Sequence, residues 1–131
     1  MKLGFIGTGE IAKAVILGIT NSKLKYKKIY ISKRNTKISK FLRSKNNKVK
    51  VINNNQKIID HSDWIFLSIT PEVGRKILKH LKFRSSQKII SFISTIKMNE
   101  LKKYIGKKSI IIRAIPLPPI SLGVGPVPIY P

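Results

Sequence analysis

The chain opens with a short apolar stretch that runs directly into a glycine-rich turn. The first six residues read Met-Lys-Leu-Gly-Phe-Ile, and they are followed at once by Gly7-Thr8-Gly9-Glu10-Ile11-Ala12. In such a turn the first glycine permits a tight change of direction, the second lets a pyrophosphate approach the backbone, and the small last residue lets the helix pack on the strand. Free N–H groups at the helix N-terminus favour an anion at the same place. The opening therefore predicts a dinucleotide-binding α/β fold, with an ordinary glycine-rich turn as the alternative.

The rest of the chain alternates between predicted strands and predicted helices. Strands are expected at residues 2–6, 28–32, 48–52, 63–70, 87–93 and 109–115, with a short last strand near 127–130. Helices are expected at residues 10–20, 36–44, 56–61, 71–81 and 97–105. Pro71 suits the first turn of a helix, Gly106 suits a helix stop, and the three asparagines at 53–55 suit a helix cap. The alternation predicts a Rossmann doubly wound, mainly parallel sheet, with strand order 3-2-1-4-5-6 and a short extra strand at the C-terminus.

Composition limits the remaining classes of protein. With 131 residues and 42% hydrophobic residues, one domain with a real core is expected. No apolar run is long enough for a membrane helix, no signal peptide is recognisable, and cysteine is absent, so a cytoplasmic protein without disulfides is expected. The 27 lysines and arginines outnumber the 5 acids and give a net charge of +22, but they are spread over a chain also rich in isoleucine and asparagine. We therefore expect only non-specific nucleic-acid binding through basic charge, and no membrane partner.

The end of the second predicted strand bears on the choice of cofactor. NAD-binding proteins usually place Asp or Glu there for the ribose 2′-hydroxyl, whereas NADP-binding proteins avoid that charge and supply cations. Here the segment reads Ser32-Lys33-Arg34-Asn35, so Lys33 or Arg34 could hold a 2′-phosphate and Ser32 could donate to it. The alternative is that these are two more solvated cations in a chain with few acids. The sequence favours NADPH as cofactor and leaves NADH possible.

The loops after the fourth and fifth strands are expected at the carboxyl edge of the sheet, where ligands bind. We predict that the nicotinamide ring lies against Ile69, Thr70 and Pro71 and against Ser94. The two histidines, His61 and His80, have no paired carboxylate pattern and are expected to be structural. No residues show metal-ligand spacing, so no metal is expected and no catalytic residue is assigned.

Several segments together form a recognisable pattern. They are Gly-Phe-Ile-Gly-Thr-Gly-Glu-Ile-Ala-Lys-Ala at 4–14, Ser-Asp-Trp-Ile-Phe-Leu-Ser-Ile-Thr-Pro at 62–71, the stretch 89–95, Arg-Ala-Ile-Pro at 113–116 and Gly-x-Gly-Pro from 123 onward. The pattern resembles the N-terminal domain of pyrroline-5-carboxylate reductases over nearly the whole chain. The resemblance implies NADPH-dependent reduction of the cyclic imine 1-pyrroline-5-carboxylate to L-proline, in proline biosynthesis. It also places Asn55 near the adenosine ribose.

The resemblance further implies how the protein is organised. Residues 1–131 would form one NAD(P)-binding domain. The helical C-terminal domain that completes the substrate pocket and forms the homo-oligomer in this family is expected to be absent. Alone, the chain should bind cofactor but turn over a small-molecule substrate poorly. The residues predicted to contact the cofactor are Gly7, Thr8, Gly9, Glu10, Ile11, Ala12, Ser32, Lys33, Arg34, Asn35, Asn55, Ile69, Thr70, Pro71 and Ser94.

Three departures from the family pattern lie where nicotinamide and substrate would meet. Thr70 replaces a lysine, Leu117-Pro118 replaces Asn-Thr, and Ile93-Ser94-Thr95 replaces Ala-Ala-Gly. The phosphate-binding turn is unchanged. The alternatives are therefore a related NADP-dependent oxidoreductase acting on another imine or carbonyl compound, a non-catalytic domain that binds nucleotides or nucleic acid, and an inactive remnant.

Overall fold

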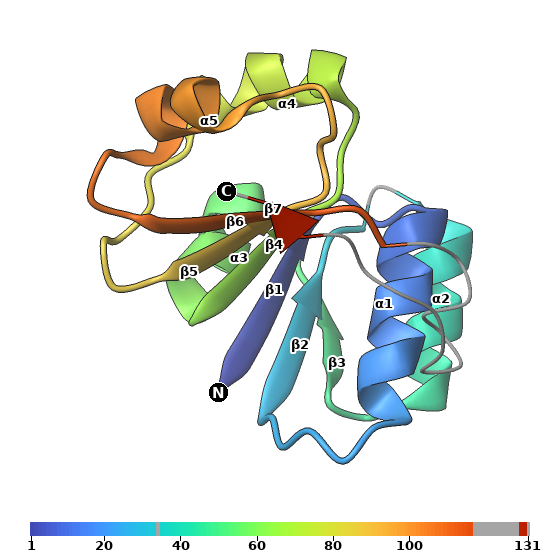
Figure 1. Ribbon diagram of the computed structural model, residues 1–131. Coiled ribbons are helices and arrows are strands. Elements are labelled where there is room, and N and C mark those ends of the chain that lie inside the picture. Colours follow the sequence, from blue (N-terminus) through green and yellow to red (C-terminus); the bar gives the residue numbers. More distant parts are fainter. Residues whose placement is uncertain (34, 117–128, 131) are drawn as a thin grey trace.

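The computed structural model describes residues 1–33, 35–116 and 129–130 of the chain (Figure 1). Arg34 and the proline-rich segment 117–128, which includes part of the last predicted strand, lie outside the described residues. The strands are β1 (Lys2–Ile6), β2 (Lys28–Ile31), β3 (Val49–Val51), β4 (Trp64–Leu67), β5 (Lys88–Ser91), β6 (Ile110–Ala114) and β7 (Ile129–Tyr130). The helices are α1 (Glu10–Thr20), α2 (Thr36–Lys45), α3 (Asn55–His61), α4 (Pro71–Ile77), the 3₁₀ turn η1 (Leu78–His80) and α5 (Met98–Ile105).

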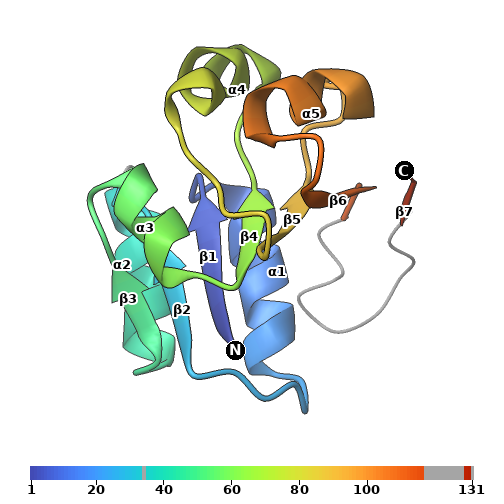
Figure 2. The ribbon, with the colours of Figure 1, turned by 90° about the vertical axis from the view of Figure 1, so that its left-hand side faces the viewer.

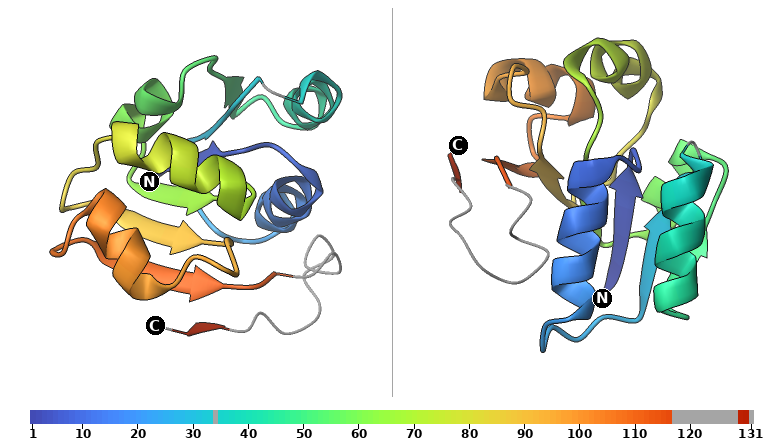
Figure 3. Two further views of the ribbon diagram at one scale, coloured as in Figure 1. Left: turned by 90° about the horizontal axis from the view of Figure 1, so that it is seen from above. Right: turned by 90° about the vertical axis from the view of Figure 1, so that its right-hand side faces the viewer.

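The strands form one sheet in the order β3-β2-β1-β4-β5-β6-β7. The first six strands of that order are parallel, with Gly4 of β1 opposite Tyr30 on one side and Ile65 on the other. Strand β7 is antiparallel to β6 and lies at the edge of the sheet (Figure 3). This confirms the predicted Rossmann topology and the strand order 3-2-1-4-5-6.

Strands β1, β2, β4 and β5 contribute side chains to two separate hydrophobic cores. In β1, Leu3 and Phe5 pack with α1 and α2, and Phe5 stacks on Phe66 of β4 with 4.5 Å between ring centroids. Ile6 faces the other way and packs with residues of α3, η1 and α5. Because both faces of the parallel strands are covered, these strands read as almost continuous apolar runs.

Small and polar residues set the close approach of α3 to β1. A Cβ atom at Gly4 would overlap the Ser62 hydroxyl and lie 2.9 Å from Cγ2 of Ile58, so only glycine fits beneath this helix. The buried Gln87 side chain donates to the carbonyls of Ile59 and Ser62 at 2.6 and 2.8 Å. It thereby fixes the C-terminal end of α3 at the start of β5.

Several predicted elements are longer than the observed ones, among them the strand predicted at 87–93, which is observed at Lys88–Ser91. The predicted strand 63–70 ends at Leu67. Ser68 N–H still donates to the Ile6 carbonyl at 2.8 Å, but two residues later the Thr70 hydroxyl accepts a hydrogen bond from Val73 N–H as the cap of α4. The predicted helix 71–81 ends at Ile77 and continues only as the turn η1. Pro71 begins α4 and Gly106 ends α5, as predicted.

The α-helices of the described part of the chain contain 7 to 11 residues each. None of them is long and apolar enough to cross a membrane.

Candidate functional site

The turn between β1 and α1 lies at the carboxyl edge of the sheet, next to the end of β4. Gly7 has φ +95°, a conformation that side-chain-bearing residues rarely adopt. A Cβ atom at this position would overlap the backbone carbonyl of Ser68 and lie 2.6 Å from Cγ2 of Ile69. Gly7 is therefore required for the path of the chain, because both the turn and the adjacent strand end exclude a side chain.

Gly9 has a different role from Gly7. Its φ of −102° is open to any residue, and a Cβ atom there would meet nothing within 4 Å. No side chain caps the N-terminus of α1, whereas α2, α3 and α4 are capped by Asn35, Asn54 and Thr70. An uncapped helix start facing open space, with no side chain between, suits a phosphate group bound by backbone N–H groups.

Three adjoining cavities follow the carboxyl edge. The largest has a volume of about 470 Å³ and is lined by Gly7, Thr8, Gly9, Asn35, Thr36, Ser68, Ile69, Thr70 and Val73. The second, of about 290 Å³, extends toward β2 and β3 and is lined by Gly7, Ser32, Lys33, Ile52, Asn53, Asn54, Asn55, Ile69 and Ile77. The third, of about 270 Å³, extends toward β5 and is lined by Gly9, Glu10, Ile11, Ser68, Ile69, Thr70 and Phe92. Because they share lining residues, among them Ile69, the three cavities form one continuous cleft along the carboxyl edge of the sheet.

A pair of buried hydroxyl groups joins the turn to the end of β2. The Thr8 hydroxyl donates to the Ser32 carbonyl at 3.0 Å, and Thr8 Oγ1 lies 2.8 Å from Ser32 Oγ. Thr8 and Ser32 are 4% and 8% exposed. Thr8 thus positions the residue at which the cofactor preference was predicted to be decided.

The β2–β3 end of the cleft is polar and has no acid among its described lining residues. Lys33 is exposed and lines the second cavity with the asparagines at 53–55. Asn54 caps α3 by accepting from Lys57 N–H at 3.0 Å, so Asn55 is the first helical residue and keeps its side chain for other partners. Asn35 lines the largest cavity, while its side-chain oxygen accepts from Ile38 N–H at 3.2 Å.

Most of the predicted cofactor residues come together at this cleft, but not all do. Those that line it are Gly7, Thr8, Gly9, Glu10, Ile11, Ser32, Lys33, Asn35, Asn55, Ile69 and Thr70. Ala12 is fully buried between α1 and the sheet, where its small side chain allows close packing. Pro71 begins α4, and Ser94 is exposed with its carbonyl accepting from Arg113 Nη2 at 2.7 Å; neither lines the three cavities. Arg34 lies outside the described residues.

Sequence reasoning missed several lining residues, among them Thr36, Ser68, Val73 and Phe92. Ser68 had a usable signal, because it directly follows the apolar run of β4 and precedes the predicted nicotinamide contact. The other three depend on how α2, α4 and β5 pack, which local sequence does not report. Within the described residues, no group of three or more His, Asp or Glu side chains could hold a metal ion.

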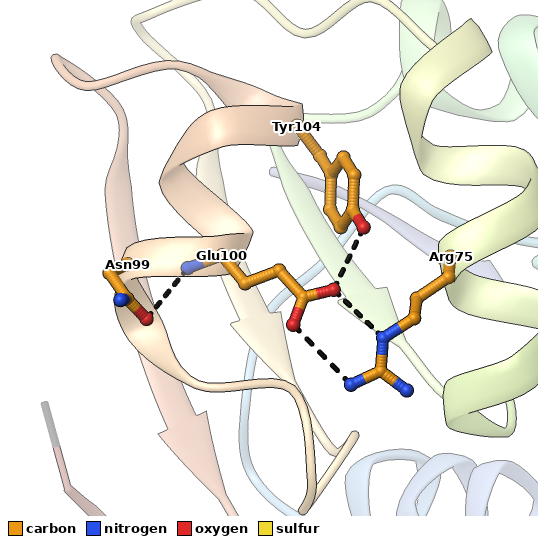
Figure 4. A network of polar contacts seen from close by, with 4 residues as sticks. All are labelled: Arg75, Asn99, Glu100 and Tyr104. Atoms are coloured by element: carbon orange, nitrogen blue, oxygen red, sulfur yellow. Dashed lines mark hydrogen bonds and ion pairs between the residues drawn. The ribbon is translucent and has the colours of Figure 1, made fainter.

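An ionic network lies above the sheet, between α4 and α5 (Figures 2 and 4). Arg75 donates to both carboxylate oxygens of Glu100 at 2.9 and 3.3 Å, and the Tyr104 hydroxyl donates to Glu100 at 2.8 Å. The hydrogen bond from Arg75 lowers the pKa of Glu100, with Tyr104 adding to the effect, and the bond to Glu100 raises the pKa of Tyr104. The network joins α4, which carries the Thr70 end of the cleft, to its neighbouring helix.

The family assignment is consistent with this cleft. A model of the family described as NADP oxidoreductase coenzyme F420-dependent matches residues 2–97. The chain belongs to this family. The matched residues contain the glycine turn, the end of β2 and all three cavities.

Within the family, the chain is similar to pyrroline-5-carboxylate reductases. It is 26% identical over 117 residues to pyrroline-5-carboxylate reductase 2 of Bacillus subtilis, covering 88% of this chain and 42% of the relative. The 1-pyrroline-5-carboxylate reductase of Streptococcus pyogenes superposes with a TM-score of 0.73 at 29% identity, over 88% of this chain and 42% of that one. The pyrroline carboxylate reductase of Plasmodium falciparum, solved with NADP bound, superposes with a TM-score of 0.82 at 23% identity, over 99% and 47%. The chain therefore spans less than half the length of the relatives it matches.

Proposed function

We propose that this chain is the cofactor-binding part of an NADPH-dependent reductase of a cyclic imine, with 1-pyrroline-5-carboxylate as substrate and L-proline as product. Residues 1–131 would act as one dinucleotide-binding domain. The observation that supports this proposal most directly is the Gly7–Gly9 turn, which leaves the uncapped N-terminus of α1 accessible from the cleft. Similarity to the Bacillus and Streptococcus reductases supports the reaction.

The residues present fit a pyrophosphate at the centre of the cleft. Gly9 leaves open space in front of the first turn of α1, and the N–H groups of that turn have no capping side chain. Backbone donors and the helix dipole would then hold the two phosphates without any need for a cationic side chain. The excess of basic residues over the whole protein would raise the rate at which an anionic cofactor is captured.

The β2–β3 end supports binding of the adenosine half. Ser32 and Lys33 lie beside Asn55 in one cavity, and none of the described residues that line it is Asp or Glu. An ammonium group there would attract a 2′-phosphate, while a carboxylate, which NAD-binding proteins use for the 2′-hydroxyl, is absent from the lining. This arrangement supports NADPH over NADH.

The β4–β5 end would receive the nicotinamide ring, and the cofactor when bound would supply the hydride. Ile11, Ile69 and Phe92 give this cavity an apolar lining against which a flat ring would pack. We assign no proton-transfer role to the described side chains that line this cavity. The substrate pocket and self-association would depend on a helical C-terminal domain of the kind that the resemblance implies.

The test is a parallel titration with NADPH and NADH near physiological salt, followed by cofactor fluorescence and calorimetry. These readouts are preferable to tryptophan quenching, because Trp64 begins β4, at the other end of the strand from the cleft. We expect NADPH to bind at least about tenfold more tightly, a difference of about 1.4 kcal/mol. Lys33→Gln should reduce that preference, and the charge-matched Lys108→Gln should not. Equal binding would refute the 2′-phosphate site, and binding of neither cofactor would refute the dinucleotide site.

A related oxidoreductase acting on another imine or carbonyl compound is the second candidate. Thr70 favours it, because the resembled family has a lysine there and the Thr70 hydroxyl here caps α4. A cation facing the substrate would attract a carboxylate, and threonine does not. A panel of cyclic imines and carbonyl compounds, tested with the complete gene product, would separate the two candidates by relative kcat/KM.

A further inference from the structure

The positive charge of the chain is unevenly distributed. Residues 11–59 contain 14 lysines and arginines and no Asp or Glu, whereas the five acids are Glu10, Asp60, Asp63, Glu72 and Glu100. Every other described α-helix therefore carries one acid, but α2 carries none. Over residues 11–59 the basic side chains are therefore not balanced by acids from the same part of the sequence.

An exposed aromatic ring lies on α2, within this acid-free part of the sequence. Phe41 on α2 is 36% exposed, and Lys37 and Lys45 flank it at spacings of four residues, which places all three on one side of the helix. Lys13 of the neighbouring helix α1 places its Nζ 4.6 Å from the Phe41 ring centroid, and Lys45 Nζ lies 5.4 Å from it (Figure 1 shows α1 beside α2). We call Lys13, Lys37, Phe41 and Lys45 the Phe41 cluster.

The Phe41 cluster borders a hollow of its own. A cavity of about 230 Å³ is lined by Glu10, Lys13, Asn35, Lys37, Ile38 and Phe41. Of these residues, only Glu10 and Asn35 also line the cleft described above, so the aromatic ring and its lysines lie outside the candidate cofactor site. The α2 side chains that complete the core are Ile38, Ser39 and Leu42, so Phe41 is not needed to fill it.

We propose that the Phe41 cluster binds single-stranded nucleic acid. An unpaired base would stack on the exposed ring, and the ammonium groups of Lys13, Lys37 and Lys45 would contact phosphates on either side. Aromatic rings among cations are the usual means of holding single strands without sequence preference. A base that stacks on the Phe41 ring would take the place of the ammonium group of Lys13 or Lys45 near that ring. The displaced ammonium group would then contact a phosphate. A duplex keeps its bases inside the stack and offers the ring nothing.

The test uses the full chain and a fluorescein-labelled oligo(dT) of about 15 nucleotides, near the upper site size of a small domain. We expect binding at moderate salt that weakens steeply as salt rises, and weaker binding of a duplex of the same length. Phe41→Leu keeps an apolar side chain but removes the ring, and should weaken oligo(dT) binding about tenfold. Phe41→Tyr keeps the ring and should bind like the unchanged protein. Thermal unfolding of each variant confirms that it is folded.

A pair of double variants separates a local site from overall charge. Lys37→Gln with Lys45→Gln removes two charges from the Phe41 cluster, and Lys102→Gln with Lys108→Gln removes two exposed charges from α5 and the turn after it. The first pair should weaken oligo(dT) binding at least about fivefold more than the second. Equal losses in the two pairs, an unchanged affinity of Phe41→Leu, or equal binding of duplex and single strand would each overturn the proposal.

Discussion

The centre of the cleft and its β4–β5 end are built in different ways. At the Gly7–Gly9 turn the site is formed by backbone atoms. Gly7 leaves room for the backbone that follows β4, and Gly9 leaves the N-terminus of α1 open to the cleft. At the β4–β5 end the lining consists of side chains, among them Ile69, Thr70 and Phe92. A backbone site tolerates almost no substitution at its glycines, whereas a side-chain site can change its chemistry while the fold persists.

This difference explains where the chain departs from the reductases that it resembles. The phosphate-binding turn keeps the resembled pattern, and the residues at positions 70 and 93–95 do not. Thr70 shows how such a change is accommodated, because its hydroxyl caps α4 and so stabilises the helix that begins there. The end that would meet the substrate is therefore the end that is free to vary.

The largest loss of stability should come from a side chain introduced at the glycine turn. Gly7→Ala forces φ +95° on a residue with a Cβ atom and drives that atom into the Ser68 carbonyl. We expect the free energy of unfolding to fall by roughly 2–4 kcal/mol, from backbone strain and overpacking together. Urea denaturation measures the loss.

Gly9→Ala is the matched control, because nothing lies within 4 Å of its added methyl group. It should lower the free energy of unfolding by about 1 kcal/mol or less, yet weaken NADPH binding at least about tenfold. A stable Gly7→Ala protein, or a Gly9→Ala protein with full affinity for NADPH, would show that the two glycines do not have these separate roles.

A smaller effect is expected at the side-chain end. Thr70→Val keeps the shape of the side chain but removes the hydroxyl that accepts from Val73 N–H at 3.3 Å. Loss of this cap should lower the free energy of unfolding by about 1 kcal/mol. Thr70→Ser retains a hydroxyl and should unfold close to the unchanged protein in the same urea titration. If valine and serine behave alike, the hydroxyl does not cap α4 in solution.

The smallest effect concerns the Arg75–Glu100–Tyr104 network, which is exposed to solvent (Figure 4). Because the pKa of Glu100 is lowered from its ordinary value of 4.5, its contribution to stability is present above that value and is lost as the pH falls through the folded-state pKa. Glu100→Gln should therefore unfold slightly more easily than the unchanged protein near neutral pH. The difference should vanish in acid and shrink with added salt. Thermal midpoints across pH measure it, and a constant difference would exclude a role for the carboxylate charge.

The fold could be predicted from the sequence because the apolar segments and the residues at helix boundaries are consistent with one topology. The alternation of strands and helices predicted the sheet, and the glycine turn together with right-handed connections predicted its strand order. Pro71 and Gly106 stand at the helix boundaries where each was expected. The end of β4 was placed too late because Ser68 and Ile69 still fit an apolar run, while their direction depends on the start of α4. Which asparagine caps α3 was also open, because Asn53, Asn54 and Asn55 have the same capping chemistry.

The features of the site that could not be predicted from the sequence depend on contacts between residues that are distant in the chain. Thr8 meets Ser32 across 24 positions, and Arg113 meets the carbonyl of Ser94 across 19. The latter contact belongs to a loop predicted to face the nicotinamide, which lies outside the lining of the three cavities. Such pairings follow from the packing of strands that no local pattern describes.

The buried hydroxyl pair at the end of β2 has two possible directions of hydrogen bonding. When Thr8 donates its proton to the Ser32 carbonyl, Ser32 Oγ donates back to Thr8 and presents only lone pairs to a ligand. When Thr8 instead donates to Ser32 Oγ, the Ser32 O–H group can donate its own hydrogen bond to a ligand. Reversing the pair turns Ser32 from an acceptor, suited to a ribose hydroxyl, into a donor, suited to a phosphate. Discrimination between the two nicotinamide cofactors would then rest on the neighbouring Lys33, because the Ser32 hydroxyl could accept from one cofactor or donate to the other while keeping its own proton.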